Sequence, residues 1–253
     1  MRSSREKTEV LRLAATGLKD AEVATLTGVP STTVGRWRRA GVLPVRRRGP
    51  QPLPPPPLQL VGEPYAYLLG LYLGDGCLSH GARVALLRVT LDARYHGIVD
   101  ECVAAIAAVK PYGRVHVYTP RAERTAIVQS VGNAWLDAFP QHGPGRTHER
   151  PIELTDWQRE IVDEFPREFL RGLIHSDGCR TTNRFKTKLP SGRVAEYEYA
   201  RYFFSNLSAD IRGLFCEYCE RLGICWAQSN PRNISISHRD SVAILDEFVG
   251  PKS

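Results

Sequence analysis

The sequence lacks the long apolar segments that mark secreted and membrane proteins. In its 253 residues no run approaches the roughly 18 apolar residues that a transmembrane helix needs. The opening stretch, MRSSREKTEVLRLAATGLK, carries charges throughout and has no apolar core of signal-peptide length. With 42% apolar residues, the chain is long enough for one large domain, or for a large domain with a small partner. We therefore expect a soluble, intracellular protein with no membrane partner.

Cysteine is scarce, and its spacing does not favour a disulfide framework. The chain has six cysteines and no secretory signal. The tightest group, Cys216, Cys219 and Cys225, is not followed by a second CxxC pair or a spaced pair of histidines, which a zinc site would need. Since the segment has the pattern of an amphipathic helix, we interpret these cysteines as small buried side chains, with part of a zinc site as the alternative.

The positive charge is confined to the first fifth of the chain. The net charge is +7, and residues 1–50 hold 11 Lys and Arg against 4 Asp and Glu, whereas residues 51–253 hold 23 of each class. A compact basic unit is typical of a nucleic-acid binder, because neutralising phosphates releases counterions. The alternative is a solvated basic face.

A proline-rich stretch divides the chain. The segment VRRRGPQPLPPPPLQL, residues 45–60, favours polyproline II, which at about 3.1 Å per residue forms a semi-rigid spacer. We expect it to separate an N-terminal unit, residues 1–44, from a larger C-terminal unit.

Three short helices are predicted before the spacer, over residues 5–16, 19–28 and 29–41. The first stops at Gly17, the second starts at an acidic cap and stops at Gly28, and the third begins at Ser31 as N-cap and ends at Gly41. Two short helices joined by a glycine-containing turn, the second rich in arginine, match a helix-turn-helix.

This N-terminal segment resembles the helix-turn-helix units of resolvases and transposases. The run GVPSTTVGRW is similar to their G-V-S-x-x-T-V-x-R-W pattern. On this reading Val34 and Trp37 face the core, and a generic three-helix bundle is the alternative. The resemblance implies DNA contacts from Thr32, Thr33, Arg36 and Arg39 in the groove and from Arg38 at the backbone.

After the spacer the sequence repeats itself. LLGLYLGDGC contains Asp75, and LRGLIHSDGC contains Asp177, 102 residues later. Beyond each motif come strand-like residues (83–91 and 198–206), an amphipathic helix (95–109 and 209–224), further strands, and a short strand leading into a closing helix (126–139 and 234–248). Two copies of one α/β unit in one chain imply a pseudo-twofold axis.

Each motif carries small residues four apart on one helix face, Gly70 and Gly74 in the first and Gly172 and Ser176 in the second. Such faces let two helix backbones approach closely. Packed about a twofold axis, the two helices would bring Asp75 and Asp177 together at their ends. Two neighbouring carboxylates call for a cation, and hard oxygen ligands select Mg²⁺, which is suited to phosphodiester hydrolysis.

The segment from about Tyr65 to Phe248 resembles a monomeric LAGLIDADG homing endonuclease, through the two motifs LLGLYLGDG and LRGLIHSDG. The resemblance implies an α+β fold in which two αββαββα LAGLIDADG-like repeats, residues 61–150 and 151–253, follow a small all-α helix-turn-helix domain. It also implies that Asp75 and Asp177 are catalytic and bind Mg²⁺, and that curved sheets bind the DNA major groove.

The second repeat predicts a DNA-reading hairpin that turns at Pro190 to Gly192. Alternating basic and aromatic side chains on such a ribbon suit major-groove reading, with a solvated hairpin as the alternative. The basic residues expected to contact DNA are Arg180, Arg184, Lys186, Lys188, Arg193 and Arg201.

The sequence departs from the family pattern in two places. Active family members usually carry a basic residue, often lysine, late in each repeat, and the stretches AIVQSVGN and ISISHRD contain no lysine. Gln129 and His238 or Arg239 are the nearest candidates for catalytic support. The first hairpin, residues 77–92, is also shorter and has fewer base-reading side chains.

We therefore predict sequence-specific binding of double-stranded DNA and Mg²⁺-dependent cleavage by a monomeric, cytoplasmic protein associated with the bacterial nucleoid. The principal alternative is a non-catalytic transcriptional regulator of the WhiA type, a family that also joins a helix-turn-helix to LAGLIDADG-like repeats but in the opposite order. An intein or an RNA-splicing factor on the same fold is a third reading, which the missing splicing-domain termini disfavour.

Overall fold

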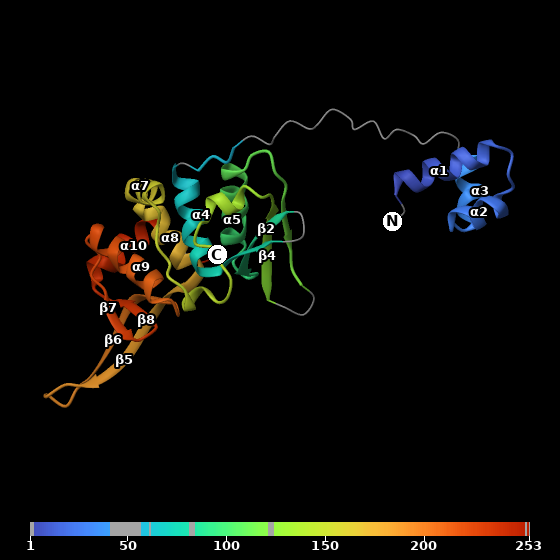
Figure 1. Ribbon diagram of the computed structural model, residues 1–253. Coiled ribbons are helices and arrows are strands. Elements are labelled where there is room, and N and C mark those ends of the chain that lie inside the picture. Colours follow the sequence, from blue (N-terminus) through green and yellow to red (C-terminus); the bar gives the residue numbers. More distant parts are fainter. Residues whose placement is uncertain are drawn as a thin grey trace. The chain divides into compact units, whose positions relative to one another are not determined.

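A computed structural model describes residues 3–40, 57–60, 62–80, 84–120, 124–250 and 252. They belong to two compact units, one within residues 1–54 and one within residues 55–253 (Figure 1). Most of the predicted spacer, residues 45–56, lies outside the described residues, as does Gly41, the predicted end of the third helix.

The first unit is a bundle of three short helices around a small apolar core. Val10, Val23, Val29 and Val34 are fully buried in it or nearly so, with Trp37 packed against them. The left-handed backbone of Gly28, with φ of +66°, ends the second helix as predicted. The helices are α1 (Ser4–Ala15), α2 (Asp20–Thr27) and α3 (Ser31–Arg39).

Two helix starts differ from the prediction by one residue. Helix α3 begins at Ser31 with Pro30 as its N-cap, because the extended Pro30 already presents its carbonyl to the amides of Thr33 and Val34. Helix α2 has Lys19 rather than an acid at its N-cap, because the Glu22 carboxylate folds back and accepts from the Lys19 amide at 2.7 Å.

The second unit repeats one order of elements twice, so the predicted pair of αββαββα halves is confirmed. The first half consists of α4 (Gly62–Asp75), β1 (Gly76–His80), β2 (Ala85–Asp92), α5 (His96–Val109), β3 (Val115–Tyr118), β4 (Thr125–Val131) and α6 (Trp135–Ala138). The second consists of α8 (Pro166–Asp177), β5 (Gly178–Lys188), β6 (Val194–Ser205), α9 (Ala209–Arg221), β7 (Ala227–Asn230), β8 (Asn233–Ile236) and α10 (Arg239–Phe248).

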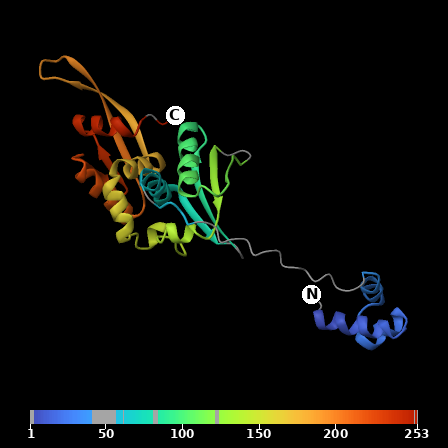
Figure 2. The same cartoon turned by 90° about the horizontal axis from the view of Figure 1, so that it is seen from above.

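Each half folds into a four-stranded antiparallel sheet with the same topology. The strand orders are β1-β2-β4-β3 and β5-β6-β8-β7, and the helices cover one face of each sheet (Figures 1 and 2). In the first sheet every second residue of β2 is buried, among them Leu87, Val89 and Leu91. In the second sheet Tyr202 and Phe204 of β6 occupy the same place, and the Phe204 ring stacks on Phe215 of α9.

A connection that the sequence analysis did not predict joins the halves. It contains the short 3₁₀ helix η1 (Thr147–Glu149) and α7 (Asp156–Glu164), which starts with a capping box between Thr155 and Gln158. The Gln158 amide is fully buried and donates to the Tyr65 hydroxyl at 2.8 Å, which ties α7 to α4. None of the helices in the described ranges is long and apolar enough to cross a membrane.

The cysteine interpretation holds for two of its three residues. Cys216 and Cys219 are buried on α9, whereas Cys225 follows that helix and is exposed. Across the described residues no three His, Cys, Asp or Glu side chains gather as a metal-binding group.

Candidate metal and nucleic-acid site

Helices α4 and α8 lie side by side (Figure 2) and touch through the small residues that the sequence singled out. A Cβ at Gly70 would lie 2.8 Å from the Leu173 amide nitrogen, and a Cβ at Gly172 would collide with the Tyr67 carbonyl oxygen. Both distances are below what side-chain carbons adopt, so only glycine allows this approach. The close packing brings the two motif ends together.

The two acids at the helix ends are neighbours. A Cβ at Gly74, next to Asp75, would lie 2.9 Å from Oδ2 of Asp177. Oδ2 of Asp177 accepts a 2.5 Å hydrogen bond from the Asn206 amide. In the described part of the chain the Asp75 carboxylate has no hydrogen-bond or ion-pair partner. A half-buried carboxylate therefore lies next to a second carboxylate.

This arrangement raises the pKa of both carboxyl groups. Burial, and then repulsion from Asp177, raises the pKa of Asp75 to about 7, although Lys252 opposes the shift. Burial also raises the pKa of Asp177, against the Asn206 hydrogen bond and Lys252, both of which lower it. The protein thus holds two acids in a place that disfavours their charge, which is typical of a functional site.

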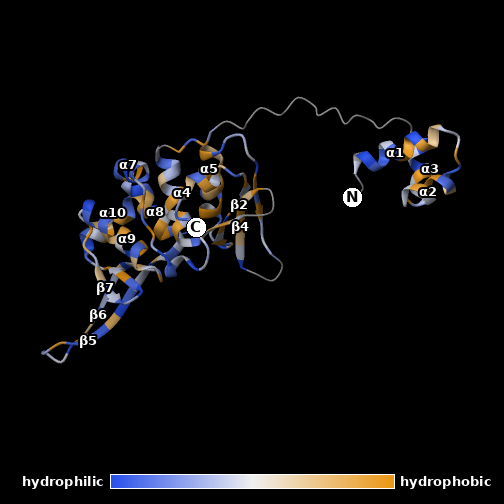
Figure 3. Cartoon of the chain, viewed as in Figure 1, coloured by the Kyte–Doolittle hydropathy of each residue, from blue (hydrophilic) through white to orange (hydrophobic). Residues whose placement is uncertain are grey.

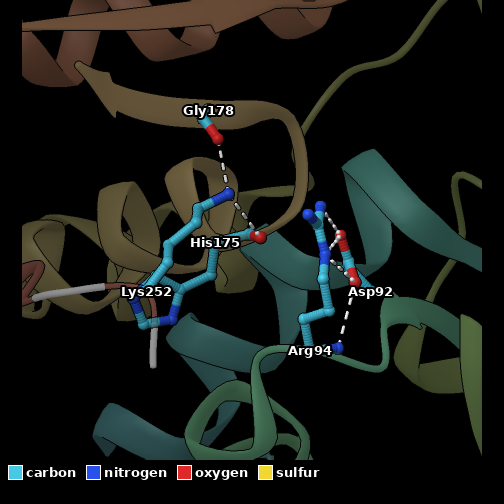
Figure 4. Close-up of polar contacts among 5 residues, drawn as sticks. All are labelled: Asp92, Arg94, His175, Gly178 and Lys252. Atoms are coloured by element: carbon cyan, nitrogen blue, oxygen red, sulfur yellow. Dashed lines mark hydrogen bonds and ion pairs between the residues drawn. The ribbon is translucent and has the colours of Figure 1, made fainter. Parts of the chain in front are cut away.

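Lys252 is a basic residue near the acids that no sequence pattern indicates. Figure 4 shows its ammonium donating to two backbone carbonyls at the end of α8, those of His175, at 3.0 Å, and Gly178. Burial lowers the pKa of His175 to about 4, so its ring is neutral. Its Nε2–H donates to the Val249 carbonyl at 3.0 Å, and its Nδ1 accepts from the Tyr67 hydroxyl at 2.9 Å. These bonds hold the chain after α10 against α8 and place Lys252 beside Asp75.

Asp75 and Lys252 line one pocket of about 550 Å³, with Arg124 at its wall. A second carboxylate of this pocket, Asp92, is not available to a cation, because Arg94 binds it through its amide and its guanidinium (Figure 4). The Arg94 hydrogen bonds lower the pKa of Asp92 to about 2.

Asp177 opens into a separate pocket of about 240 Å³. Thr147 and His148 of η1 line it, with Asn206 from the end of β6. The order of the elements explains why the two pockets are built alike. η1 follows α6, the last helix of the first half, and Lys252 follows α10, the last helix of the second half. Each acid therefore lies beside the segment that leaves the other half.

The donor set fits Mg²⁺. Asp75 and Asp177 offer hard carboxylate oxygens, one of them without a hydrogen-bond partner in the described chain, and Mg²⁺ usually takes one or two carboxylates and completes its shell with water and phosphate oxygens. Asp75 and Asp177 are the residues that would hold the ion.

Gln129, His238 and Arg239 do not line either pocket. Gln129 lies late in β4, where it pairs with Arg88, and His238 and Arg239 start α10. The reason is the antiparallel order: the starts of β4 and β8 adjoin the ends of β2 and β6, near the acids, so residues late in these strands lie away from them. Arg124, just before β4, lines the pocket of Asp75.

The hairpin residues predicted to bind DNA lie on two different faces of β5–β6. Direct partners in the register share a face, and Arg180 pairs with buried Tyr202 on the helix-covered side. Arg184 and Lys186 share this side with Arg180, and so does Lys188, whereas Arg201 lies on the opposite, open face. Arg193 closes the turn through its carbonyl, which accepts from the Leu189 amide, and the turn contains the predicted residues Pro190 to Gly192.

Three of these cations are already bound to carboxylates. Nε of Arg180 donates to Oδ1 of Asp246 at 2.8 Å, and Nε of Arg184 lies 3.1 Å from Oε2 of Glu198. Nζ of Lys186 lies 3.4 Å from Oε2 of Glu196. Arg201 has no carboxylate partner among the described residues; its guanidinium donates to the Ser235 hydroxyl and lies 4.2 Å from the Phe203 ring centroid.

In the first unit the predicted recognition residues lie on the outer side of α3. Thr32, Arg36 and Arg39 are exposed, and Thr33 is half-buried. Arg38 is also exposed, but its guanidinium donates to the Leu18 carbonyl at 2.5 Å and pairs with Asp20 at 3.1 Å. Arg38 therefore braces α3 against the start of α2.

Comparisons with known proteins add the following. Residues 1–40 match the homeodomain-like domain family, and no curated protein matches the chain. Among solved structures, the LAGLIDADG meganuclease I-AabMI bound to uncleaved DNA is 12% identical, with a TM-score of 0.44 and coverage of 73% of this chain and 82% of that one. I-DmoI in complex with DNA and Mn is 11% identical, with a TM-score of 0.46 and coverage of 75% and 97%. Full-length DUF199/WhiA from Thermatoga maritima is 16% identical, with a TM-score of 0.45 and coverage of 74% and 55%. The first unit is a homeodomain-like helix-turn-helix domain.

The raised pKa of Asp75 predicts a stability difference between wild type and Asp75→Asn. Between about pH 4, where the unfolded carboxyl titrates, and about pH 7, the folded protein keeps a proton that the unfolded chain has lost. The free energy of unfolding therefore falls as the pH rises through this window. Asn carries no charge, so Asp75→Asn should be more stable than wild type by about 1–3 kcal/mol at pH 8 and equal to it near pH 4. Urea unfolding in EDTA at both pH values measures this, and a difference that does not change with pH would contradict it.

Proposed function

We propose that this protein is a sequence-specific endonuclease that hydrolyses phosphodiester bonds of double-stranded DNA with Mg²⁺. One observation carries the proposal: close packing of α4 and α8 sets two carboxylates with raised pKa values side by side, next to Lys252. A pair of acids that is unfavourable without a cation becomes favourable once a divalent ion and a phosphate share the site.

The residues of the site would divide the work as follows. Asp75 and Asp177 supply the negative charge that holds Mg²⁺, which when bound polarises the phosphate and lowers the pKa of a bound water. Lys252 donates two ammonium hydrogens to the carbonyls of His175 and Gly178, and its third ammonium hydrogen would face the phosphate. Its positive charge would offset the charge that grows on the phosphate oxygens.

The open faces of the two sheets would bind the duplex. In the first sheet Arg88, Gln129 and His116 form one row across β2, β4 and β3, on the face opposite the buried Val89. In the second sheet Arg201 lies on the corresponding face. Polar and basic side chains in a row on an uncovered sheet suit contacts in the major groove.

The helix-turn-helix domain would supply a second DNA contact through α3. Arg36→Ala with Arg39→Ala should weaken DNA binding and reduce the slope of log affinity against log salt by about 2, since each cation that neutralises a phosphate contributes about 0.9. Binding titrations at several salt concentrations measure the slope.

The matched control is Arg12→Ala, because Arg12 is an exposed arginine of α1 that is already paired with Glu9 at 2.7 Å. We expect this variant to keep the wild-type slope. If the slope is unchanged in the Arg36 and Arg39 variant, α3 does not contact the DNA.

A non-catalytic regulator is the second candidate. It is favoured by the homeodomain-like domain and by the Asp177 pocket, which His148 lines and in which no lysine is among the described lining residues. Such a protein would bind its site without cutting it.

One experiment separates the two functions. A randomised duplex library is incubated with the full chain in Mg²⁺ or in EDTA, and the bound and the cut molecules are sequenced. Cuts at one enriched sequence that need Mg²⁺ support the endonuclease. Enrichment without cuts supports the regulator, and no enrichment overturns both.

A further inference from the structure

The β5–β6 hairpin is much longer than the sheet to which it belongs. β8 pairs with only four residues of β6, Tyr202 to Ser205, so residues 182–200 form a two-stranded arm (Figure 1). Hydrophilic and hydrophobic residues alternate along it (Figure 3). An isolated hairpin is marginally stable in water, so cross-strand side-chain pairs must support the arm, and they differ between its two faces.

Two basic residues on the charged face of the arm are paired with acids. Arg184 pairs with Glu198 and Lys186 with Glu196, and each pair lies directly opposite in the register. These side chains give the arm cross-strand support, but they offer little free positive charge to a phosphate.

The other face carries exposed aromatic rings. Phe185 and Tyr197 stack with centroids 5.3 Å apart, and Phe185 meets Tyr199 edge-on at 6.0 Å. Their exposed fractions are 44%, 44% and 36%, high for rings that cluster. The face continues toward the sheet through Asn183 and Arg201, and Arg201 has no carboxylate partner in the described chain.

Asn183 is oriented by its neighbour. Its amide nitrogen donates to the Tyr199 hydroxyl at 2.7 Å, which fixes the plane of the amide. One amide hydrogen and the amide oxygen stay available. A donor next to an acceptor in this geometry complements N7 and the N6 amino group of adenine in the major groove.

From these observations we infer that the aromatic face of the β5–β6 arm reads A·T base pairs in the major groove, with thymine methyl groups against Phe185 and Tyr197 and adenine at Asn183. The inference rests on the proposed binding of duplex DNA and adds the bases that one part of the target contains. A two-stranded ribbon fits the roughly 12 Å width of the major groove. From Arg180 to Arg201 six cations against two acids give the hairpin the net positive charge that a duplex requires.

The test begins with the duplex that the full chain enriches from a random library. The same selection is repeated with Asn183→Ala and with Phe185→Ala plus Tyr197→Ala. Each variant should lose its preference at a small set of A·T positions and retain the rest of the sequence, with affinity for the wild-type target reduced roughly 5- to 100-fold. Val194→Ala, an exposed apolar residue on the charged face of the same arm, is the matched control and should select the wild-type sequence.

A second measurement removes the methyl groups from the DNA instead of the rings from the protein. Uracil in place of thymine at the mapped positions should lower the affinity of the wild-type chain by roughly fourfold per methyl, the fold-change for about 0.8 kcal/mol. The same replacement should have no effect on the Phe185 and Tyr197 variant, since it has no rings to contact the methyl group.

Three results would overturn the inference while leaving duplex binding intact: arm variants that select the wild-type sequence, lost positions that are G·C, or a uracil effect that is the same with and without the rings. The inference would also be overturned if the variants lost binding to single-stranded oligonucleotides but still bound duplex DNA, because the rings would then stack on unpaired bases. If the wild-type chain does not bind duplex DNA at all, the proposed function and the inference are both overturned.

Discussion

Replacing both Asp75 and Asp177 by Asn is expected to abolish Mg²⁺-dependent cleavage, by at least about 1,000-fold, while DNA affinity stays within about threefold of wild type. The ion contributes several kcal/mol of charge stabilisation in phosphodiester hydrolysis, and each 1.36 kcal/mol is worth about tenfold in rate. Asn keeps the shape of Asp but cannot supply the charge that holds Mg²⁺. Cleavage and binding are measured on the same labelled duplex.

Asp92→Asn is the matched control for this pair. Asp92 lines the same pocket as Asp75, but its carboxylate is committed to Arg94. We expect this variant to cleave within about tenfold of wild type. The assignment would be wrong if the double variant still cut, or if Asp92→Asn alone removed all activity.

The second large effect is on folding. Gly172→Ala should lower the free energy of unfolding by about 3 kcal/mol or more, beyond the usual range for overpacking, because the new Cβ would meet backbone atoms and not a flexible side chain. The Tyr67 carbonyl and the Gly70 Cα, at 3.0 Å, belong to the facing helix and cannot move without parting α4 from α8. Urea unfolding followed by near-ultraviolet circular dichroism measures the loss.

Gly213→Ala is its control, since Gly213 lies on α9 with nothing within 4 Å of the position of a Cβ. Alanine there should raise stability by roughly 0.5–1 kcal/mol through its better helix propensity. If both alanine variants have similar stabilities, the close approach of α4 and α8 does not depend on glycine.

The sequence predicts the helix pair and the meeting of the acids because both follow from local rules. Apolar residues, small residues four apart and an Asp-Gly end occur twice in the same order, so each local pattern supports the same global arrangement. The fold of each half follows likewise from alternating strands and amphipathic helices, and the structure has these elements within a few residues of the expected places.

Lys252 could not be found in the same way. It lies in a short C-terminal segment without periodicity, and its place depends on the bond between His175 and the Val249 carbonyl, two residues that are 74 positions apart. Proximity that is created by tertiary contacts between distant residues leaves no local pattern. Gln129 and His238 are predicted from their position late in each repeat. The distance of a residue from the acids depends instead on the direction in which its strand runs.

The sequence contains a signal for which side chains share a face of the hairpin. Tyr202 and Phe204 alternate as large apolar residues and mark the side of β6 that faces the core. Carrying that alternation across the predicted turn would have placed Arg180, Arg184 and Lys186 on the same side, opposite Arg201. The carboxylates that bind these cations, such as Asp246 on α10, come from tertiary structure and were beyond reach.

We propose that Asp75 and Asp177 bind a divalent metal together. The most direct measurement is Mn²⁺ binding by electron paramagnetic resonance, in the presence of the selected duplex, for wild type and for the Asp75→Asn, Asp177→Asn double variant. We expect tight Mn²⁺ uptake by wild type at pH 8, weaker uptake at pH 6, where Asp75 is mostly protonated, and none above background for the variant. Equal uptake by the two proteins would contradict it.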